Sequence, residues 1–91
     1  MNLKYSEKSL KDLSNFSHPD RVLIIKRIHY LSDNFELLKN SNKVTELIGC
    51  KFRQQYRFIV AKKIRVLFRV ENEDIILLIL RVGRRKNIYG G

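Results

Sequence analysis

Apolar and polar residues alternate along two segments in the second half of the chain, a pattern typical of β-strands with one buried face. In residues 56–61 every second side chain is aromatic or aliphatic, and residues 64–70 repeat the pattern. The positions between these apolar side chains include Arg57, Arg65 and Arg69. If the two segments form a hairpin, burial of both apolar sets on one side projects the three arginines together from the other side.

The same alternation predicts a register for this hairpin. Pairing the apolar faces places Phe58 near Phe68 and Arg57 opposite Arg69, with residues 62–64 as an odd-length loop. A slip by one residue would bury the arginines, so the pattern strongly favours this choice of faces.

Three other segments have strand-like patterns. Residues 75–80 are apolar on both faces, which is typical of a strand inside its sheet, and the acidic turn 71–74 separates them from the preceding strand. Residues 2–5 and 44–48 are shorter candidates, and Gly49 ends the second of them. The sequence therefore predicts a sheet built mainly from its C-terminal half.

Helical spacing marks the first half of the chain. Ser6 is a good N-cap for a helix over residues 7–15, with an apolar stripe at Leu10, Leu13 and Phe16. The stripe predicts that this helix packs on the sheet through one face.

A second and longer helix is predicted from Pro19 to about Ser32, with either Ser17 or His18 as its cap. Residues 35–38 either extend it by a turn or form a loop. Its inward face is expected to hold Ile24, Ile28 and Leu31, and its outward face Arg21, Lys26 and Arg27.

These elements follow one another in the order β-α-α-β-β-β-β. They predict a single α+β domain over residues 1–91, in which an N-terminal strand and a helical hairpin pack on one face of a twisted, mainly antiparallel sheet. The other face of the sheet is expected to carry the arginines.

Charge is the most informative part of the composition. The chain has 19 Lys+Arg against 9 Asp+Glu, a formal net charge of +10. Residues 51–91 hold 11 of the basic and 3 of the acidic side chains, so the excess lies mostly on the strand-rich half. A solvated basic face is the plain explanation. The asymmetry favours a polyanionic partner, nucleic acid first and an acidic protein or membrane surface second.

Other chemistries find little support in the sequence. His18 and His29 lie eleven residues apart without a Cys or carboxylate cluster at ligand spacing, so neither a metal nor another cofactor is expected. The single cysteine, Cys50, has no internal partner for a disulfide and is expected to be structural. The first residues lack the apolar region of a signal peptide, and residues 75–80 are too short to span a bilayer, so the expected location is the cytoplasm.

The order of motifs resembles a known family. The runs are Y-R-F-I-V (56–60), I-R-V-L-F-R-V (64–70) and I-I-L-L-I-L-R-V-G-R-R-K-N-I-Y (75–89), preceded by E-L-I-G (46–49). Together with the two helices they are similar to the RelE/ParE toxin superfamily of bacterial toxin–antitoxin modules. The resemblance implies a small toxin held inactive by a cognate antitoxin. In RelE-like members the activity is metal-independent cleavage of mRNA in the ribosomal A site by the messenger's own 2′-OH.

The resemblance also implies site residues. Arg65 and Arg85 match phosphate-clamping arginines, Arg57 matches a positive group near the 2′-OH, and Tyr89 matches a tyrosine that stacks on a base or transfers a proton. Tyr89 could equally pack the chain end onto the sheet. The remaining RNA-binding candidates are Arg69, Arg84, Lys86, Lys62 and Lys63.

Two departures from the family pattern keep other functions open. Ile59 stands where RelE-like nucleases often have a second basic residue, and no Glu or His obviously supplies a general base. ParE-like relatives inhibit DNA gyrase by binding, without nuclease chemistry, and an inactive RNA-binding relative is a third alternative. In each toxin case the expected antitoxin lays an amphipathic segment over the sheet surface, with its acids opposite the arginines, and only the antitoxin complex contacts DNA.

Overall fold

The computed structural model describes residues 1–47, 55–71 and 76–84. Its elements are β1 (Asn2–Tyr5), α1 (Glu7–Ser14), α2 (His18–Asp33), α3 (Phe35–Asn40), β2 (Val44–Glu46), β3 (Gln55–Val60), β4 (Ile64–Glu71) and β5 (Ile76–Arg84). The predicted break at Gly49 and most of the acidic turn lie outside the described residues.

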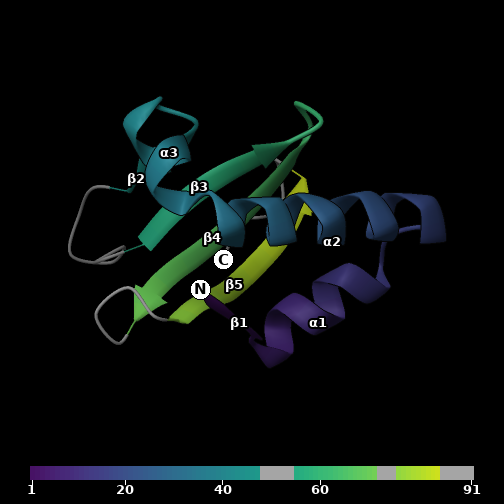
Figure 1. Ribbon diagram of the computed structural model, residues 1–91. Helices are drawn as coiled ribbons and strands as arrows, with labels where there is room; N and C mark the ends of the chain where they lie inside the picture. The colour runs from purple at the N-terminus through teal and green to yellow at the C-terminus, as the bar shows by residue number, and fades with distance from the viewer. Residues whose placement is uncertain (48–54, 72–75, 85–91) are drawn as a thin grey trace.

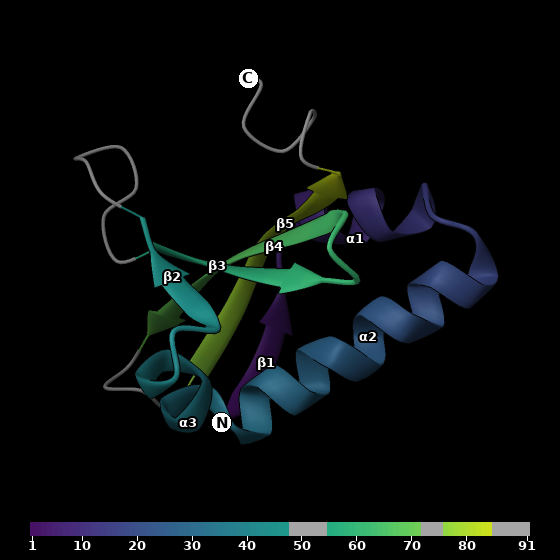
Figure 2. The same cartoon turned by 90° about the horizontal axis from the view of Figure 1, so that it is seen from above.

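The strands form one five-stranded sheet in the order β1-β5-β4-β3-β2 (Figure 1). β1 runs parallel to β5, and the other neighbours are antiparallel. α2 crosses one face of the sheet, and α1 lies beside β5 (Figures 1 and 2). The predicted α+β class is confirmed, and so is the interior place of the doubly apolar strand, because β5 has a neighbour on each side.

Serine side chains begin both long helices. The Ser6 hydroxyl accepts from the Ser9 N–H at 3.0 Å, and the Ser17 hydroxyl accepts from the Asp20 N–H at 3.4 Å. Ser17, not His18, is therefore the cap of α2. Residues 35–38 belong to the separate helix α3, which Asn34 divides from α2 by leaving helical geometry.

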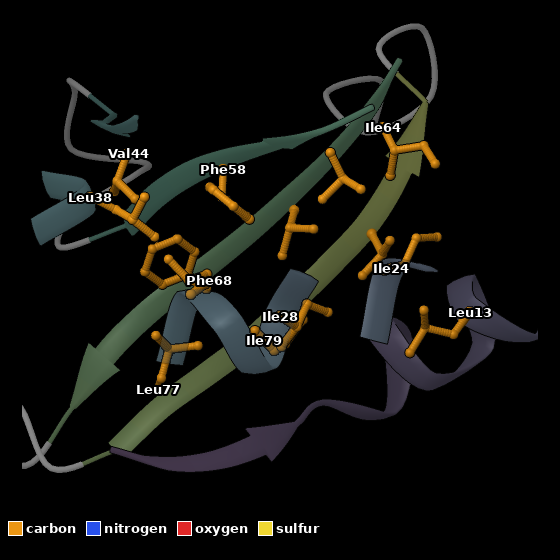
Figure 3. Packing of buried hydrophobic residues seen from close by; sticks show 14 of the residues in the cluster. Leu13, Ile24, Ile28, Leu38, Val44, Phe58, Ile64, Phe68, Leu77 and Ile79 are labelled. Atoms are coloured by element: carbon orange, nitrogen blue, oxygen red, sulfur yellow. The ribbon is translucent and has the colours of Figure 1, made fainter. Parts of the chain in front are cut away.

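The core lies between the helices and the sheet (Figure 3). Ile24, Ile28 and Leu31 of α2 are fully buried in one cluster with Phe68 of β4 and Ile79 of β5, as their spacing predicts. At 25 cal/mol per Å², burial of side chains of this kind stabilises the fold by about 1.5–3 kcal/mol each. The sheet face that carries this core is thus fixed by hydrophobic burial.

Some predicted helix faces are wrong. Leu10 is 54% exposed, while Ser9 takes its place in the buried face of α1. Arg21 does not point outward, because its guanidinium donates to the carbonyls of Leu13 and Phe16 and satisfies the C-terminal end of α1. Arg27 packs its guanidinium group over aromatic rings of the core edge.

The predicted hairpin register is also wrong, by two residues. Phe58 pairs with Val66, not Phe68, and Arg57 lies opposite Leu67, not Arg69. Ile64 is 6% exposed and begins β4, so burial draws it out of the predicted loop. The turn instead uses residues 61–63, of which Ala61 and Lys62 have positive φ. Because the error is an even number, each side chain keeps its predicted face.

β5 continues beyond the predicted residue 80 to Arg84. Its pairing with β4 shifts between Leu67 and Phe68, since Leu67 pairs with Arg81 and Phe68 with Ile79. Leu80 is therefore an extra residue, a β-bulge that changes which β5 side chains face the core. None of the described helices is long and apolar enough to span a membrane.

Candidate functional site

Arginines surround Leu67 on the sheet face opposite the core. By register, Arg57 on β3 and Arg81 on β5 lie directly across from Leu67, and Arg65 and Arg69 lie two residues before and after it on β4. Diagonal neighbours on such a face lie about 7–8 Å apart. These four residues, Arg57, Arg65, Arg69 and Arg81, are called the arginine ring below. The prediction that the first three share one face is confirmed, although Arg57 lies opposite Leu67 and not opposite Arg69.

Leu67 is only 5% exposed although it lies on the face without helices. The methylene groups of long basic side chains cover apolar surface while their charged ends stay in water. Three members of the arginine ring on these strands, Arg57, Arg65 and Arg69, are half-buried. Leu67 is therefore an apolar position at the centre of the ring, of the kind that such side-chain stems cover.

The ring members differ in how their charge is compensated. Arg81 binds Asp12 through two contacts, of 2.8 and 3.2 Å, and this pairing raises the pKa of Arg81 above its ordinary value. Arg69 binds Glu71 at 3.1 Å, with both side chains more than a third exposed, so this ion pair is weak. Arg65 instead donates to the main-chain oxygen of Lys62 at 3.0 Å. That neutral partner orients the guanidinium group without offsetting its charge.

A glycine and additional charge lie next to Arg65. Its directly paired neighbour on β5 is Gly83, which has no side chain to shield it. The preceding turn exposes Lys62 and Lys63, two of the predicted RNA-binding residues. The described residues at this end of the sheet therefore combine three cations with a position that carries no side chain.

Arg84 lies on the other side of the sheet. It pairs with the buried Ile64, and its guanidinium carbon lies 5.1 Å from the centre of the Phe16 ring. Arg84 and Phe16 help to line a hollow of about 250 Å³ between α1 and β5, which Asp12 and Arg81 also line. The structure therefore does not bring Arg84 to Arg57 and Arg65. Three further predicted site residues, Arg85, Lys86 and Tyr89, lie outside the described residues.

Sequence reasoning missed Asp12 and Arg81. Their side chains meet across 69 positions of sequence, and nothing in the local pattern of either segment marks them as partners. Ile59, in contrast, is where the sequence suggests, on the arginine face and 41% exposed opposite Arg65. Within residues 1–47, 55–71 and 76–84, no group of three His, Cys, Asp or Glu side chains is placed to hold a metal ion.

The fold and this face define a small α+β domain with a basic sheet surface, a class suited to anionic partners. The family comparison identifies it further. The sequence family model for the ParE toxin of type II toxin–antitoxin systems matches residues 3–89, almost the whole chain. The chain therefore belongs to this toxin family, within the RelE/ParE superfamily that its motifs resemble.

Solved structures support the same fold. The toxin–antitoxin complex RelBE2 from Mycobacterium tuberculosis matches with a TM-score of 0.75 at 16% identity, covering 92% of this chain and 96% of that one. The isolated RelE toxin of E. coli matches with a TM-score of 0.70 at 18% identity, covering 97% and 89%. The YoeB/ParE toxin from Agrobacterium tumefaciens matches with a TM-score of 0.64 at 16% identity, covering 93% and 99%. No curated protein sequence matches significantly.

Proposed function

We propose that this toxin is an endoribonuclease that cleaves mRNA in the ribosomal A site without a metal ion. The observation that carries the proposal is the arginine ring, in particular Arg57 and Arg65 on neighbouring strands around Leu67. An RNA phosphate placed over this face would meet two guanidinium groups from different directions. Charge of this kind stabilises a phosphate most as negative charge develops on it during reaction.

The proposed reaction uses the substrate's own nucleophile. The 2′ oxygen of the messenger forms a bond to the adjacent phosphorus, and the bond from phosphorus to the 5′ oxygen breaks. The 2′-OH loses its proton to a base and the leaving 5′ oxygen gains one, which yields a 2′,3′-cyclic phosphate and a 5′-OH. Arg65 and Arg85 are assigned to hold the phosphate oxygens, because a guanidinium group binds two oxygens at once and keeps its charge. Arg57 is assigned to the region of the 2′-OH.

Tyr89 is assigned to stack on a base or to transfer a proton in this reaction. Outside the reacting centre, the ribosomal RNA would be held by further cations. These are Lys62 and Lys63 in the hairpin turn, Arg69 toward the other end of β4, Arg84 at the end of β5, and Lys86, two residues further along the sequence.

The test maps 5′ ends on a message bound to programmed ribosomes, with and without purified toxin. We expect new ends within the A-site codon, and a loss of about 10²–10³-fold in cleavage rate for Arg65→Ala or Arg85→Ala, the range seen when one charge-stabilising donor is removed. Lys26→Ala is the control, because Lys26 is exposed on α2, away from the ring. An intact message at toxin concentrations that arrest growth would refute the proposal.

The second candidate is inhibition of DNA gyrase by binding. Two observations favour it. The matching family model is that of the ParE toxin of parDE systems, and Ile59 places an exposed aliphatic side chain beside Arg65. An apolar side chain among cations suits a protein interface better than a phosphate site. Inhibition of gyrase supercoiling by the pure toxin, with an intact message on ribosomes, would establish this function. Ile59→Arg separates the two, because it adds a phosphate ligand but disrupts an apolar contact.

A cognate antitoxin is the proposed protein partner, and the cytoplasm the proposed location. The RelBE2 relative was solved as a toxin–antitoxin complex, although at 16% identity it shows only the fold. We expect the antitoxin of this chain to place acidic side chains opposite Arg57 and Arg65, with contact to DNA made only through the complex. Addition of salt should then slow the association of the two proteins.

A further inference from the structure

The free edge of β5 is completed by α1. β1 pairs with β5 only as far as Ile79. Beyond that point Ser6 takes over, since its N–H donates to the Ile79 carbonyl at 2.9 Å and its hydroxyl donates to the Leu80 carbonyl at 2.8 Å. Further along this edge, the N–H of Val82 donates to the Asp12 carboxylate at 2.9 Å. The edge of β5 from Ile79 to Val82 is thus bound by Ser6, the cap of α1, and by Asp12 within α1.

Asp12 binds three donors at once. Besides the N–H of Val82, its carboxylate accepts from Nε of Arg81 at 2.8 Å and from Nη2 of Arg81 at 3.2 Å. The Asp12 side chain is 14% exposed, so solvent weakens this pair less than it weakens an exposed one. A charge-assisted, two-point contact of this kind also fixes orientation, because both guanidinium bonds must be in plane.

The two residues that Asp12 binds follow the bulge directly. Leu80 is the extra residue, and without it the alternation would turn Val82 outward and Arg81 toward the core. With it, Val82 is 2% exposed in the core and Gly83 lies on the ring face beside Arg65. The state in which Asp12 makes all three bonds is therefore the state in which the bulge is present.

We propose that Asp12 is a positioning residue that fixes the bulge in β5 and thereby the places of Gly83 beside Arg65 and of Arg84, the last described residue of β5. The next residue in sequence is Arg85, which the proposed function assigns to the phosphate. Among the described residues, Asp12 binds Arg81 and Val82 and neither Arg57 nor Arg65, so it acts through Arg81 and Val82. The expected effect on kcat rests on the proposed function. The expected effect on the bulge does not depend on that function.

Asp12→Asn tests the inference because it keeps size and one acceptor oxygen but removes the charge and places an N–H₂ group against Arg81. Amide hydrogen exchange by NMR gives the structural result. We expect exchange at Val82 and Gly83 to rise at least about tenfold, while Tyr56 and Phe58 on β3, two strands away from β5, stay protected. Asp33→Asn is the matched control, an aspartate at the exposed end of α2, and should leave all four amides unchanged.

Kinetics separate positioning from a general loss of stability. On programmed ribosomes, Asp12→Asn should lower kcat about tenfold or more with little change in KM, at temperatures where the variant is folded. A second variant, Arg81→Gln combined with Asp12→Asn, restores a neutral pair of amides and should recover part of the exchange protection and of kcat. This double variant also serves if the single variant folds poorly.

The outcomes distinguish the two proposals. Unchanged exchange at Val82 in Asp12→Asn would overturn the inference, whatever the toxin's target. Raised exchange with the kcat of the Asp33→Asn control would overturn its functional part. If the wild-type toxin cleaves no message, the nuclease proposal fails, and growth arrest by the variants then replaces kcat as the measure of the positioning effect.

Discussion

The arginine ring makes a quantitative prediction for binding to single-stranded RNA. If Arg57, Arg65 and the two turn lysines each neutralise one phosphate, the slope of log affinity against log salt is about −0.7 for each contact, or roughly −2.8 in total. Affinity then falls about 50-fold between roughly 50 and 200 mM salt, because binding releases counterions and this release becomes less favourable as the salt concentration rises. Arg65→Gln removes one contact and should reduce the slope to about −2.1 and the loss to about 18-fold.

Fluorescence anisotropy of a labelled RNA oligonucleotide, titrated with toxin at four or more salt concentrations, measures this slope directly. Lys26→Gln is the control for the change in net charge, since Lys26 is an exposed residue of α2 on the helix side of the molecule. Arg69→Gln should have the smaller effect, because Glu71 already binds Arg69. If Lys26→Gln and Arg65→Gln reduce the slope equally, the toxin binds RNA by overall charge and the ring is not its interface.

Two further predictions concern the fold. Phe68 is fully buried, and its ring centroid lies 5.5 Å from that of Tyr56 and 6.0 Å from that of Phe35. In urea titrations, Phe68→Ala should lower the free energy of unfolding by about 3–5 kcal/mol, and Phe68→Leu by roughly 1 kcal/mol. Equal losses for the two variants would contradict this packing. Burial raises the pKa of Tyr5 above 10.0, so the folded state holds that proton more tightly and stability should fall as pH rises above 10.0. Tyr5→Phe should reduce this loss, measured by urea unfolding on either side of that pH, and an unchanged pH dependence would show that Tyr5 does not contribute.

The hairpin shows how far a local pattern reaches. Alternation in β3 and β4 correctly assigned every side chain to a face, because the period of two follows from strand geometry. The register that it predicted was wrong by two residues, because such a shift keeps all faces and changes only the partners. The buried position of Ile64 and the positive φ of Ala61 and Lys62 decided between these registers. Neither is visible in the alternation of the strands.

Helix faces divide in the same way. The stripe of Ile24, Ile28 and Leu31 was predicted correctly, since three-to-four spacing of large aliphatic residues specifies a buried face wherever the helix packs. Leu10 was predicted wrongly, because α1 lies beside β5 and buries only Ser9 and Leu13. How much of a helix is buried depends on what lies next to it, and that is a tertiary property.

By itself the sequence determined the class of fold, the toxin superfamily and the face on which Arg57, Arg65 and Arg69 lie, because periodicity, composition and motif order are local or additive. Only the tertiary structure placed Arg84 over Phe16 on the opposite side of the sheet from the ring, since the bulge at Leu80 reverses the alternation of β5. It alone brought Asp12 to Arg81 across 69 positions of sequence. Such contacts depend on the path of the whole chain, and no local pattern of residues records that path.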